Sequence, residues 1–154
     1  MKRKATHATI GVFAEPRTLN PEPMFLALDH PCIACLDVRK QVEWYCLALG
    51  MRVIADDGKE PPGFLVGYDG TVTGGAMIEL VPARDPGPRA DAFKRFQPGL
   101  RHVALRVADF DEAHARLRHL GVPFTAEPGQ ALGGGRTVLF RDPEGNELQI
   151  VQRK

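Results

Sequence analysis

Apolar and polar positions follow the same order twice along this chain. In the first copy, the apolar run Leu28–Leu36 predicts a strand, and Asp37 is a suitable N-cap for a helix over Val38–Leu49. One face of that helix is apolar, at Val38, Val42, Tyr45 and Leu49. Gly50 predicts its end, because glycine readily adopts the left-handed conformation that terminates helices. Further strands are predicted over Met51–Ala55, Phe64–Tyr68 and Ala76–Val81.

The second copy repeats these signals. Leu100–Val107 predicts a strand and Asp109 a helix cap, and Gly121 marks the end of the helix. The apolar face of this helix consists of Phe110, Ala113, Leu117 and Leu120. Further strands are predicted over Val122–Thr125, Arg136–Arg141 and Glu147–Gln152. Each copy is therefore β-α-β-β-β, an α+β arrangement, and we expect the two copies to pack about a pseudo-twofold axis.

The length of 154 residues suits one domain built from two such modules. We expect a single domain over residues 25–154, with modules at about 25–82 and 99–153. A proline-rich linker joins them and is expected to contain one helical turn around Phe93. Residues 1–24 show little periodicity and are expected to form a flexible N-terminal extension, whose apolar stretch is too short for a signal peptide.

Composition narrows the classes of function. A formal net charge of +1 does not favour binding to nucleic acid or to an acidic membrane surface, and no apolar run is long enough to span a bilayer. Three cysteines, an odd number, argue against a disulfide framework, so we expect a cytoplasmic protein. Cys32 and Cys35 form a CxxC pair, but residues three apart on a strand point to opposite faces. Packing is therefore favoured over redox or zinc chemistry.

Four polar residues lie at matched positions within the apolar strands. His30 in the first copy corresponds to His102 in the second, and Glu79 corresponds to Gln149. Burying such groups without partners costs about 1–3 kcal/mol each. One shared metal ion would satisfy all four, since two neutral imidazoles and a carboxylate suit divalent Zn, Ni, Co, Fe or Mn. The alternative is that each histidine is an ordinary surface or core residue.

The segments that carry these residues resemble a known family. They are LDHPCIACLD, WYCLALGMRV, GGAMIELV, GLRHVALRV and RDPEGNELQIV. Over residues 25–153 the chain resembles the vicinal oxygen chelate superfamily, which has the glyoxalase/bleomycin resistance/dioxygenase fold. The resemblance implies paired βαβββ modules that form a cup-shaped mixed sheet around a metal, with His30, Glu79, His102 and the residue at position 149 as ligands. The pattern is most similar to uncharacterised bacterial relatives of glyoxalase I.

Position 149 departs from the family pattern. The DPxGN motif is usually followed by two residues and then a glutamate, but RDPEGNELQIV has Gln149 there. An amide oxygen is a weaker, neutral ligand. Glu147 lies on the same strand face, and a register slip or bulge would let it substitute. The glutamine counts against an extradiol dioxygenase, whose iron site uses a glutamate at this position, and against an epimerase, which needs a base on each face.

By resemblance, we expect a metal-dependent lyase or isomerase of the glyoxalase I (lactoylglutathione lyase) type. Its substrate would be a small molecule with two adjacent oxygens, such as the hemithioacetal of methylglyoxal and a thiol cosubstrate. Zn, Ni or Co is favoured as the metal, with Mn or Fe as alternatives, and Glu79 is the expected base that moves a proton between adjacent carbons. The alternatives are a metal-free drug-binding protein of the bleomycin resistance type and an extradiol ring-cleavage dioxygenase. We also expect a homodimer, because such cups often pair with a second chain.

Two further features are candidates for substrate contacts. Arg106 has the same strand parity as His102, so it would either meet an anionic group inside the cup or lie at the solvent end of the strand. The segment PGQALGGGRT predicts either a mobile lid or a flexible hairpin. It lacks the strand-to-helix context of a phosphate-binding loop.

Overall fold

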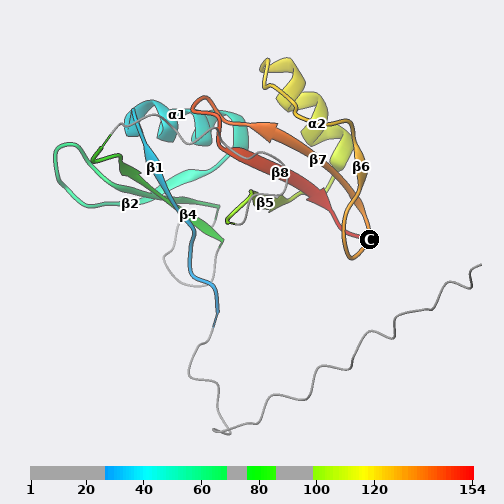
Figure 1. Ribbon diagram of the computed structural model, residues 1–154, viewed down its shortest axis with the longest axis horizontal. Helices are drawn as coiled ribbons and strands as arrows, with labels where there is room; N and C mark the ends of the chain where they lie inside the picture. The colour runs from blue at the N-terminus through cyan, green and yellow to red at the C-terminus, as the bar shows by residue number, and fades with distance from the viewer. Residues whose placement is uncertain (1–26, 69–75, 86–98) are drawn as a thin grey trace, which may run out of the picture.

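The computed structural model describes residues 27–68, 76–85 and 99–154 (Figure 1). The first repeat contains β1 (Cys32–Cys35), α1 (Val38–Leu49), β2 (Arg52–Asp56), β3 (Phe64–Gly67) and β4 (Met77–Pro82). The second repeat contains β5 (Val103–Arg106), α2 (Phe110–His119), β6 (Gly129–Gln130), β7 (Arg136–Arg141) and β8 (Glu147–Gln152). The predicted βαβββ order is thus confirmed in both repeats.

Each repeat builds its own four-stranded mixed sheet. The strand order is β1-β4-β3-β2 in the first sheet and β5-β8-β7-β6 in the second. In both, the first strand of the repeat lies at the edge and pairs in parallel with the last strand. The other pairs in each sheet are antiparallel. The two sheets therefore have the same topology, so residues at matched sequence positions also have matched places in the fold.

Both helices begin at their predicted caps, and α1 also ends at its predicted glycine, whereas the C-cap of α2 is Leu120, one residue before the expected Gly121. The side chain of Asp37 accepts a hydrogen bond from the backbone N–H of Lys40 at the start of α1. Asp109 accepts one from Glu112 at the start of α2. Gly50, which ends α1, has a φ of 72°, in the left-handed region that glycine adopts at little cost.

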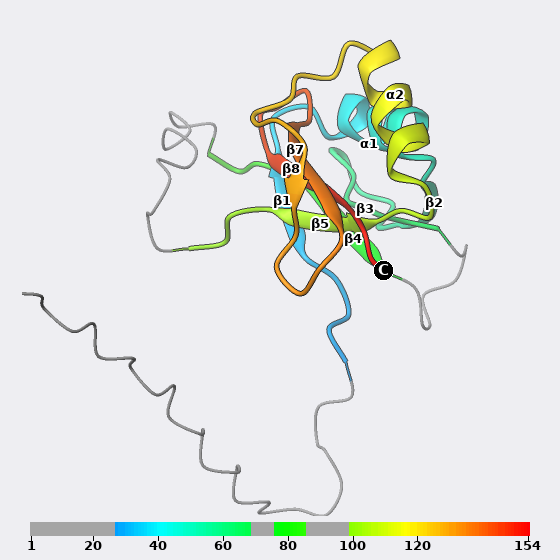
Figure 2. The same ribbon diagram turned by 90° about the vertical axis from the view of Figure 1, so that its right-hand side faces the viewer.

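Both helices pack on the same side of the molecule (Figures 1 and 2), and one continuous hydrophobic core joins the two repeats. Alternate residues of the last strands, such as Leu80 in β4 and Leu148 and Ile150 in β8, are buried in that core. Positions of opposite parity at the sheet edges are exposed, such as Cys32 in β1 and Ala104 in β5. Each sheet therefore has a helix-covered face and an open face.

A turn of the second repeat holds helix α1 of the first repeat. Asp142, which is 3% exposed, accepts hydrogen bonds at Oδ2 from Gln41 Nε2 (2.6 Å), the Tyr45 hydroxyl (3.1 Å) and Asn146 Nδ2 (2.7 Å). Its Oδ1 accepts from the backbone N–H groups of Glu144 (3.0 Å) and Asn146 (2.8 Å). This buried carboxylate thus connects two residues on one face of α1 to the turn that precedes β8.

Contacts at both ends of α1 strengthen the connection. The carboxylate of Glu144 accepts hydrogen bonds from the backbone N–H groups of Leu36 (2.9 Å) and Asp37 (2.8 Å), just before α1 begins. At the other end, Arg116 of α2 donates to the carbonyls of Leu47 and Ala48. Backbone groups that a helix end leaves unpaired are therefore satisfied from the other repeat.

Three predicted strands differ from the observed ones. Pairing begins only at Cys32 in β1 and at Val103 in β5, so both strands are shorter than the apolar runs Leu28–Leu36 and Leu100–Val107. Val122–Thr125 forms only an isolated bridge through Phe124, and β6 lies further along the chain. Prolines at 123 and 128 lack the N–H group that a continuous ladder needs.

Two predictions lie outside the described residues: the N-terminal extension over residues 1–24 and the helical turn around Phe93. None of the helices in the described part of the chain is long and apolar enough to cross a membrane. Cys32, Cys35 and Cys46 are free thiols, and Cys32 is exposed while Cys35 is buried, as expected for residues on opposite faces of a strand.

Candidate metal centre

His30 and Glu79 lie side by side at the edge of the first sheet. His30 precedes β1, and Glu79 belongs to β4, the parallel neighbour of β1. The backbone N–H of Glu79 donates to the carbonyl of Pro31 at 2.9 Å, which brings the two side chains together. His30 Nε2 lies 3.6 Å from Glu79 Oε2, and both side chains are partly exposed. We call this pair the first half-site.

The separation within the first half-site suits two ligands of one metal ion. A histidine–carboxylate hydrogen bond is normally shorter than about 3.2 Å. Two donor atoms that each lie about 2.1 Å from a tetrahedral metal are roughly 3.4 Å apart. The observed 3.6 Å between the nitrogen of His30 and the oxygen of Glu79 is close to the second value. The two residues therefore fit a divalent transition metal in both chemistry and spacing.

The carboxylate of Glu79 also has a thiol neighbour and borders a cavity. Cys32 lies opposite Glu79 in the β1–β4 ladder, and its thiol is hydrogen-bonded to the carboxylate. Partial burial, followed by this hydrogen bond and the negative charge of Glu79, raises the pKa of Cys32 to about 11. Glu79 further lines a cavity of about 170 Å³ on the open face of the sheet, beside Leu65 and Val81. A small molecule can therefore reach the carboxylate from that face.

His102 and Gln149 occupy the corresponding positions in the second sheet. The β5–β8 ladder places Ala104 opposite Gln149, the same register that Cys32 and Glu79 have in the first sheet. His102 lies two residues before Ala104 and is partly exposed, as is Gln149. We call His102 and Gln149 the second half-site.

Glu147 does not take the place of Gln149. The β7–β8 ladder runs from Arg141 to Gln152 without a bulge, so no register slip brings Glu147 forward. Its carboxylate is buried and accepts hydrogen bonds from Arg101 (2.9 Å) and Thr125 (3.3 Å). Glu147 is therefore bound by other partners, and the residue matched to Glu79 is Gln149, whose side-chain amide is neutral.

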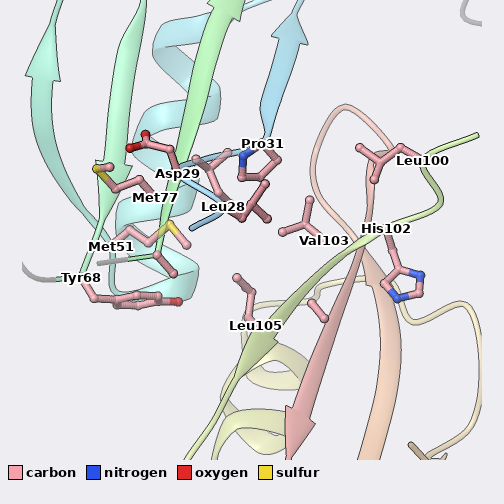
Figure 3. A pocket seen from close by; sticks show the side chains of 13 residues that line it. Leu28, Asp29, Pro31, Met51, Tyr68, Met77, Leu100, His102, Val103 and Leu105 are labelled. Atoms are coloured by element: carbon pink, nitrogen blue, oxygen red, sulfur yellow. The ribbon is translucent and has the colours of Figure 1, made fainter. Parts of the chain in front are cut away.

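The two half-sites do not come together within one chain. In the described part of the chain, no three His, Cys, Asp or Glu side chains gather closely enough to hold a metal ion. His102 is one of the residues that line the pocket between the repeats, and Figure 3 shows its imidazole on the opposite side of β5 from Val103 and Leu105. A single chain thus presents two incomplete ligand sets.

The pocket between the repeats is apolar. It has a volume of about 280 Å³ and is lined by residues of both repeats, among them Met51, Met77 and Leu105 (Figure 3). Leu28 and Leu100, each two residues before a half-site histidine, are 88% and 69% exposed at its rim. Together with the apolar lining of the pocket, these two leucines form an apolar rim that another molecule can cover.

Arg106 lies on the open face of the second sheet. It is exposed, as is Ala104, and both have the same strand parity as His102. Arg106 has no ion-pair partner among the described residues. Four residues of extended strand place its Cα about 13 Å from that of His102. The second half-site therefore has an available cation at a distance that a small anionic substrate can bridge.

The hydrophobic pattern did not single out the residues that precede the two histidines. Asp29 contacts His30 Nδ1 at 2.6 Å, whereas Arg101, at the matched position before His102, contacts Glu147. The sequence does contain a signal for this difference. It is the reversal of charge at matched positions, with an acid before one histidine and a base before the other.

Comparison with known proteins places this geometry in a family. The family profile described as "Glyoxalase/Bleomycin resistance protein/Dioxygenase superfamily" matches residues 27–150. The chain belongs to this superfamily. The match spans both repeats, so the recognition made from the sequence motifs and the predicted fold are both confirmed.

Individual known proteins are similar to this chain over nearly their whole length. The uncharacterised protein YwkD of Bacillus subtilis (strain 168) is 30% identical over 130 residues, which are 82% of this chain and 97% of that protein. The lactoylglutathione lyase of Salmonella typhimurium is 29% identical over 140 residues, which are 84% and 94% of the two chains. A crystal structure of a superfamily member from Sphaerobacter thermophilus is 26% identical, with a TM-score of 0.62 over 83% of this chain and 98% of that one.

Proposed function

We propose that this protein is a metal-dependent lyase or isomerase of the glyoxalase I type. It would move a proton between adjacent carbons of a small substrate that chelates the metal through two oxygens, such as the hemithioacetal of methylglyoxal and a thiol. The observation that carries the proposal is the 3.6 Å spacing of His30 Nε2 and Glu79 Oε2, which suits joint metal ligation. The similarity to lactoylglutathione lyases supports the choice of reaction.

The proposed ligands are His30, Glu79, His102 and Gln149, contributed by two chains of a homodimer. The first half-site of one chain would face the second half-site of the partner, since the half-sites do not meet within one chain. The exposed Leu28 and Leu100 beside the histidines support an interface at this place, because burying them there removes apolar surface from water. Each dimer would then contain two equivalent metal centres.

The two half-sites would have different roles in the reaction. When bound, a divalent Zn, Ni or Co ion supplies Lewis-acid polarisation of the substrate oxygens. Glu79 is the proposed base: its carboxylate borders the cavity on the open face and can accept a proton from the carbon next to a carbonyl and return it to the neighbouring carbon. Gln149 cannot accept a proton at neutral pH, so it would only ligate and orient. The chemistry would therefore use one base on one face of the substrate.

Arg106 would determine which substrates bind well. Its guanidinium, on the open face of β5 and without an ion-pair partner among the described residues, can form a bidentate contact with a carboxylate. We therefore expect a preference for thiol cosubstrates that carry a carboxylate. The corresponding measurement is the KM for hemithioacetals of a carboxylated thiol and of an uncharged thiol, in the wild-type protein and in Arg106→Gln.

A complementation experiment tests the shared metal site. His30→Ala and His102→Ala are prepared separately, and metal content is measured for each alone and after the two are mixed and allowed to exchange subunits. Each variant alone should lose the metal. In the mixture, a heterodimer has one centre with both histidines and one with neither, so random exchange restores about one quarter of the wild-type content. No restoration would contradict a site shared between chains.

Activity and metal binding together test the reaction. Wild-type protein loaded with Zn, Ni or Co should convert the hemithioacetal, and Glu79→Gln should lose turnover while keeping part of the metal. If Glu79→Gln turns over normally, Glu79 is not the base. If the wild-type protein binds none of Zn, Ni, Co, Mn or Fe, the proposal fails. Metal-free binding of a small molecule is then the better account of this fold.

A further inference from the structure

The two half-sites differ in the residue that precedes each histidine. In the first half-site, Asp29 Oδ1 lies 2.6 Å from His30 Nδ1. In the second, the matched residue is Arg101, whose guanidinium contacts Glu147 at 2.9 Å instead. Of the two histidines, therefore, only His30 has its ring contacted by the carboxylate of the preceding residue.

The contact with Asp29 determines which ring nitrogen carries the proton. An ionised carboxylate only accepts hydrogen bonds, so Nδ1 of His30 must be the donor. In the neutral imidazole the other nitrogen, Nε2, then has a free lone pair. This is the nitrogen that lies 3.6 Å from Glu79 Oε2. The lone pair of His30 and the carboxylate of Glu79 are thus presented to the same space.

We propose that Asp29 is a positioning residue that fixes His30 in the Nδ1–H form and so prepares the first half-site to bind metal before the second. The metal part of this inference rests on the proposed function, whereas the tautomer is a property of the metal-free protein. A carboxylate on the far nitrogen of a ligand histidine fixes the ring orientation and makes the ligand more basic. Removing such a partner typically lowers metal affinity by about 10- to 100-fold.

The second half-site differs from the first because the residue before its histidine is Arg101, which has no carboxylate. Arg101 forms an ion pair with the buried Glu147, so it stabilises the second repeat and does not orient His102 as Asp29 orients His30. The first half-site also contains the anionic ligand Glu79, while the second contains the neutral Gln149. Charge and orientation therefore both favour initial capture of a cation at His30 and Glu79.

The tautomer can be measured without any metal or substrate. Protein labelled with ¹⁵N-histidine is studied by long-range ¹H–¹⁵N NMR at a mildly alkaline pH, and the His30 ring is assigned from a His30→Gln spectrum. Wild-type His30 should show a protonated Nδ1 and an unprotonated Nε2. Asp29→Ala should move the proton to Nε2, the form preferred in water, and Asp29→Asn should keep the wild-type pattern in part, because its amide oxygen still accepts. Glu43→Gln is the matched control: it removes one exposed carboxylate on α1 and should change nothing.

Metal affinity is then measured by competition with a chromogenic chelator. Asp29→Ala should bind Zn or Co about 10- to 100-fold more weakly than the wild type, with Asp29→Asn between them and Glu43→Gln unchanged. An unchanged His30 tautomer in Asp29→Ala would overturn the proposal, and so would a changed tautomer with unchanged affinity. If the wild-type protein binds no metal while the tautomer shifts as expected, the proposed function fails and the positioning of His30 by Asp29 stands.

Discussion

Replacing Asp142 by asparagine tests the connection between the two repeats. Oδ1 of this buried carboxylate accepts two backbone hydrogen bonds, and Oδ2 accepts three from side chains. An amide places an NH₂ group at one of the two positions, so Asp142→Asn loses two or three hydrogen bonds whichever way it is oriented. Hydrogen bonds to a charged acceptor contribute about 1.5 kcal/mol or more each, so the expected loss is roughly 3–5 kcal/mol.

The assay is urea unfolding followed by far-UV circular dichroism. The midpoint should fall while the slope of free energy against urea stays the same, and thermal unfolding should shift down by roughly 10 °C. Asp111→Asn is the control: its carboxylate pairs only with Arg136 on the surface, so a much smaller change is expected. Tyr45→Phe should lie between the two, because it removes one of the five donors. A midpoint for Asp142→Asn equal to that of Asp111→Asn would refute the reasoning.

Three further predictions concern local chemistry and backbone geometry. Glu79→Gln should lower the pKa of Cys32 from about 11 and speed the alkylation of this thiol at pH 9. The pKa should stay above the ordinary thiol value, because partial burial is the larger cause of the shift. An unchanged alkylation rate would contradict the contact between Cys32 and Glu79. The pKa of Asp57 is lowered to about 2, chiefly by hydrogen bonds from backbone N–H groups, so its contribution to stability is complete above the usual carboxyl range and is lost as the pH falls towards 2. Asp57→Asn should therefore show a shallower loss of stability between pH 4 and pH 2, measured by urea midpoints. Gly135→Ala should destabilise the protein clearly more than Gly134→Ala in thermal unfolding, because both have positive φ but only at Gly135 would the methyl group overlap a backbone carbonyl of β8.

Much of the fold follows from local signals. Helix α1 has its predicted limits because a cap at Asp37 and a left-handed Gly50 are strong boundaries that depend on few residues. β7 and β8 also have their predicted limits, since clear alternation is flanked by turn residues. The apolar runs before β1 and β5 were misleading, because apolar residues also line the pocket between the repeats without joining a ladder.

The candidate site was only partly predictable. Matching the repeats assigned His30 and Glu79 to one site, and in the structure the parallel pairing of β1 and β4 brings the two side chains together. The sequence could not reveal that His102 does not join this pair in one ligand cluster within the described part of the chain, because that depends on how the two sheets pack. Nor could it reveal the partner of Glu147, since the ion pair with Arg101 joins residues far apart in the chain.

The turn that holds helix α1 makes the first repeat depend on the second. Glu144 satisfies backbone N–H groups just before α1, and Asp142 binds two side chains of the same helix, so the first repeat depends on the second for its helix. A fragment that ends at the linker would leave those groups without partners and would expose the shared core to water. Although the chain is built from two similar repeats, they share one core and one set of helix contacts, so we expect neither repeat to be stable when expressed alone.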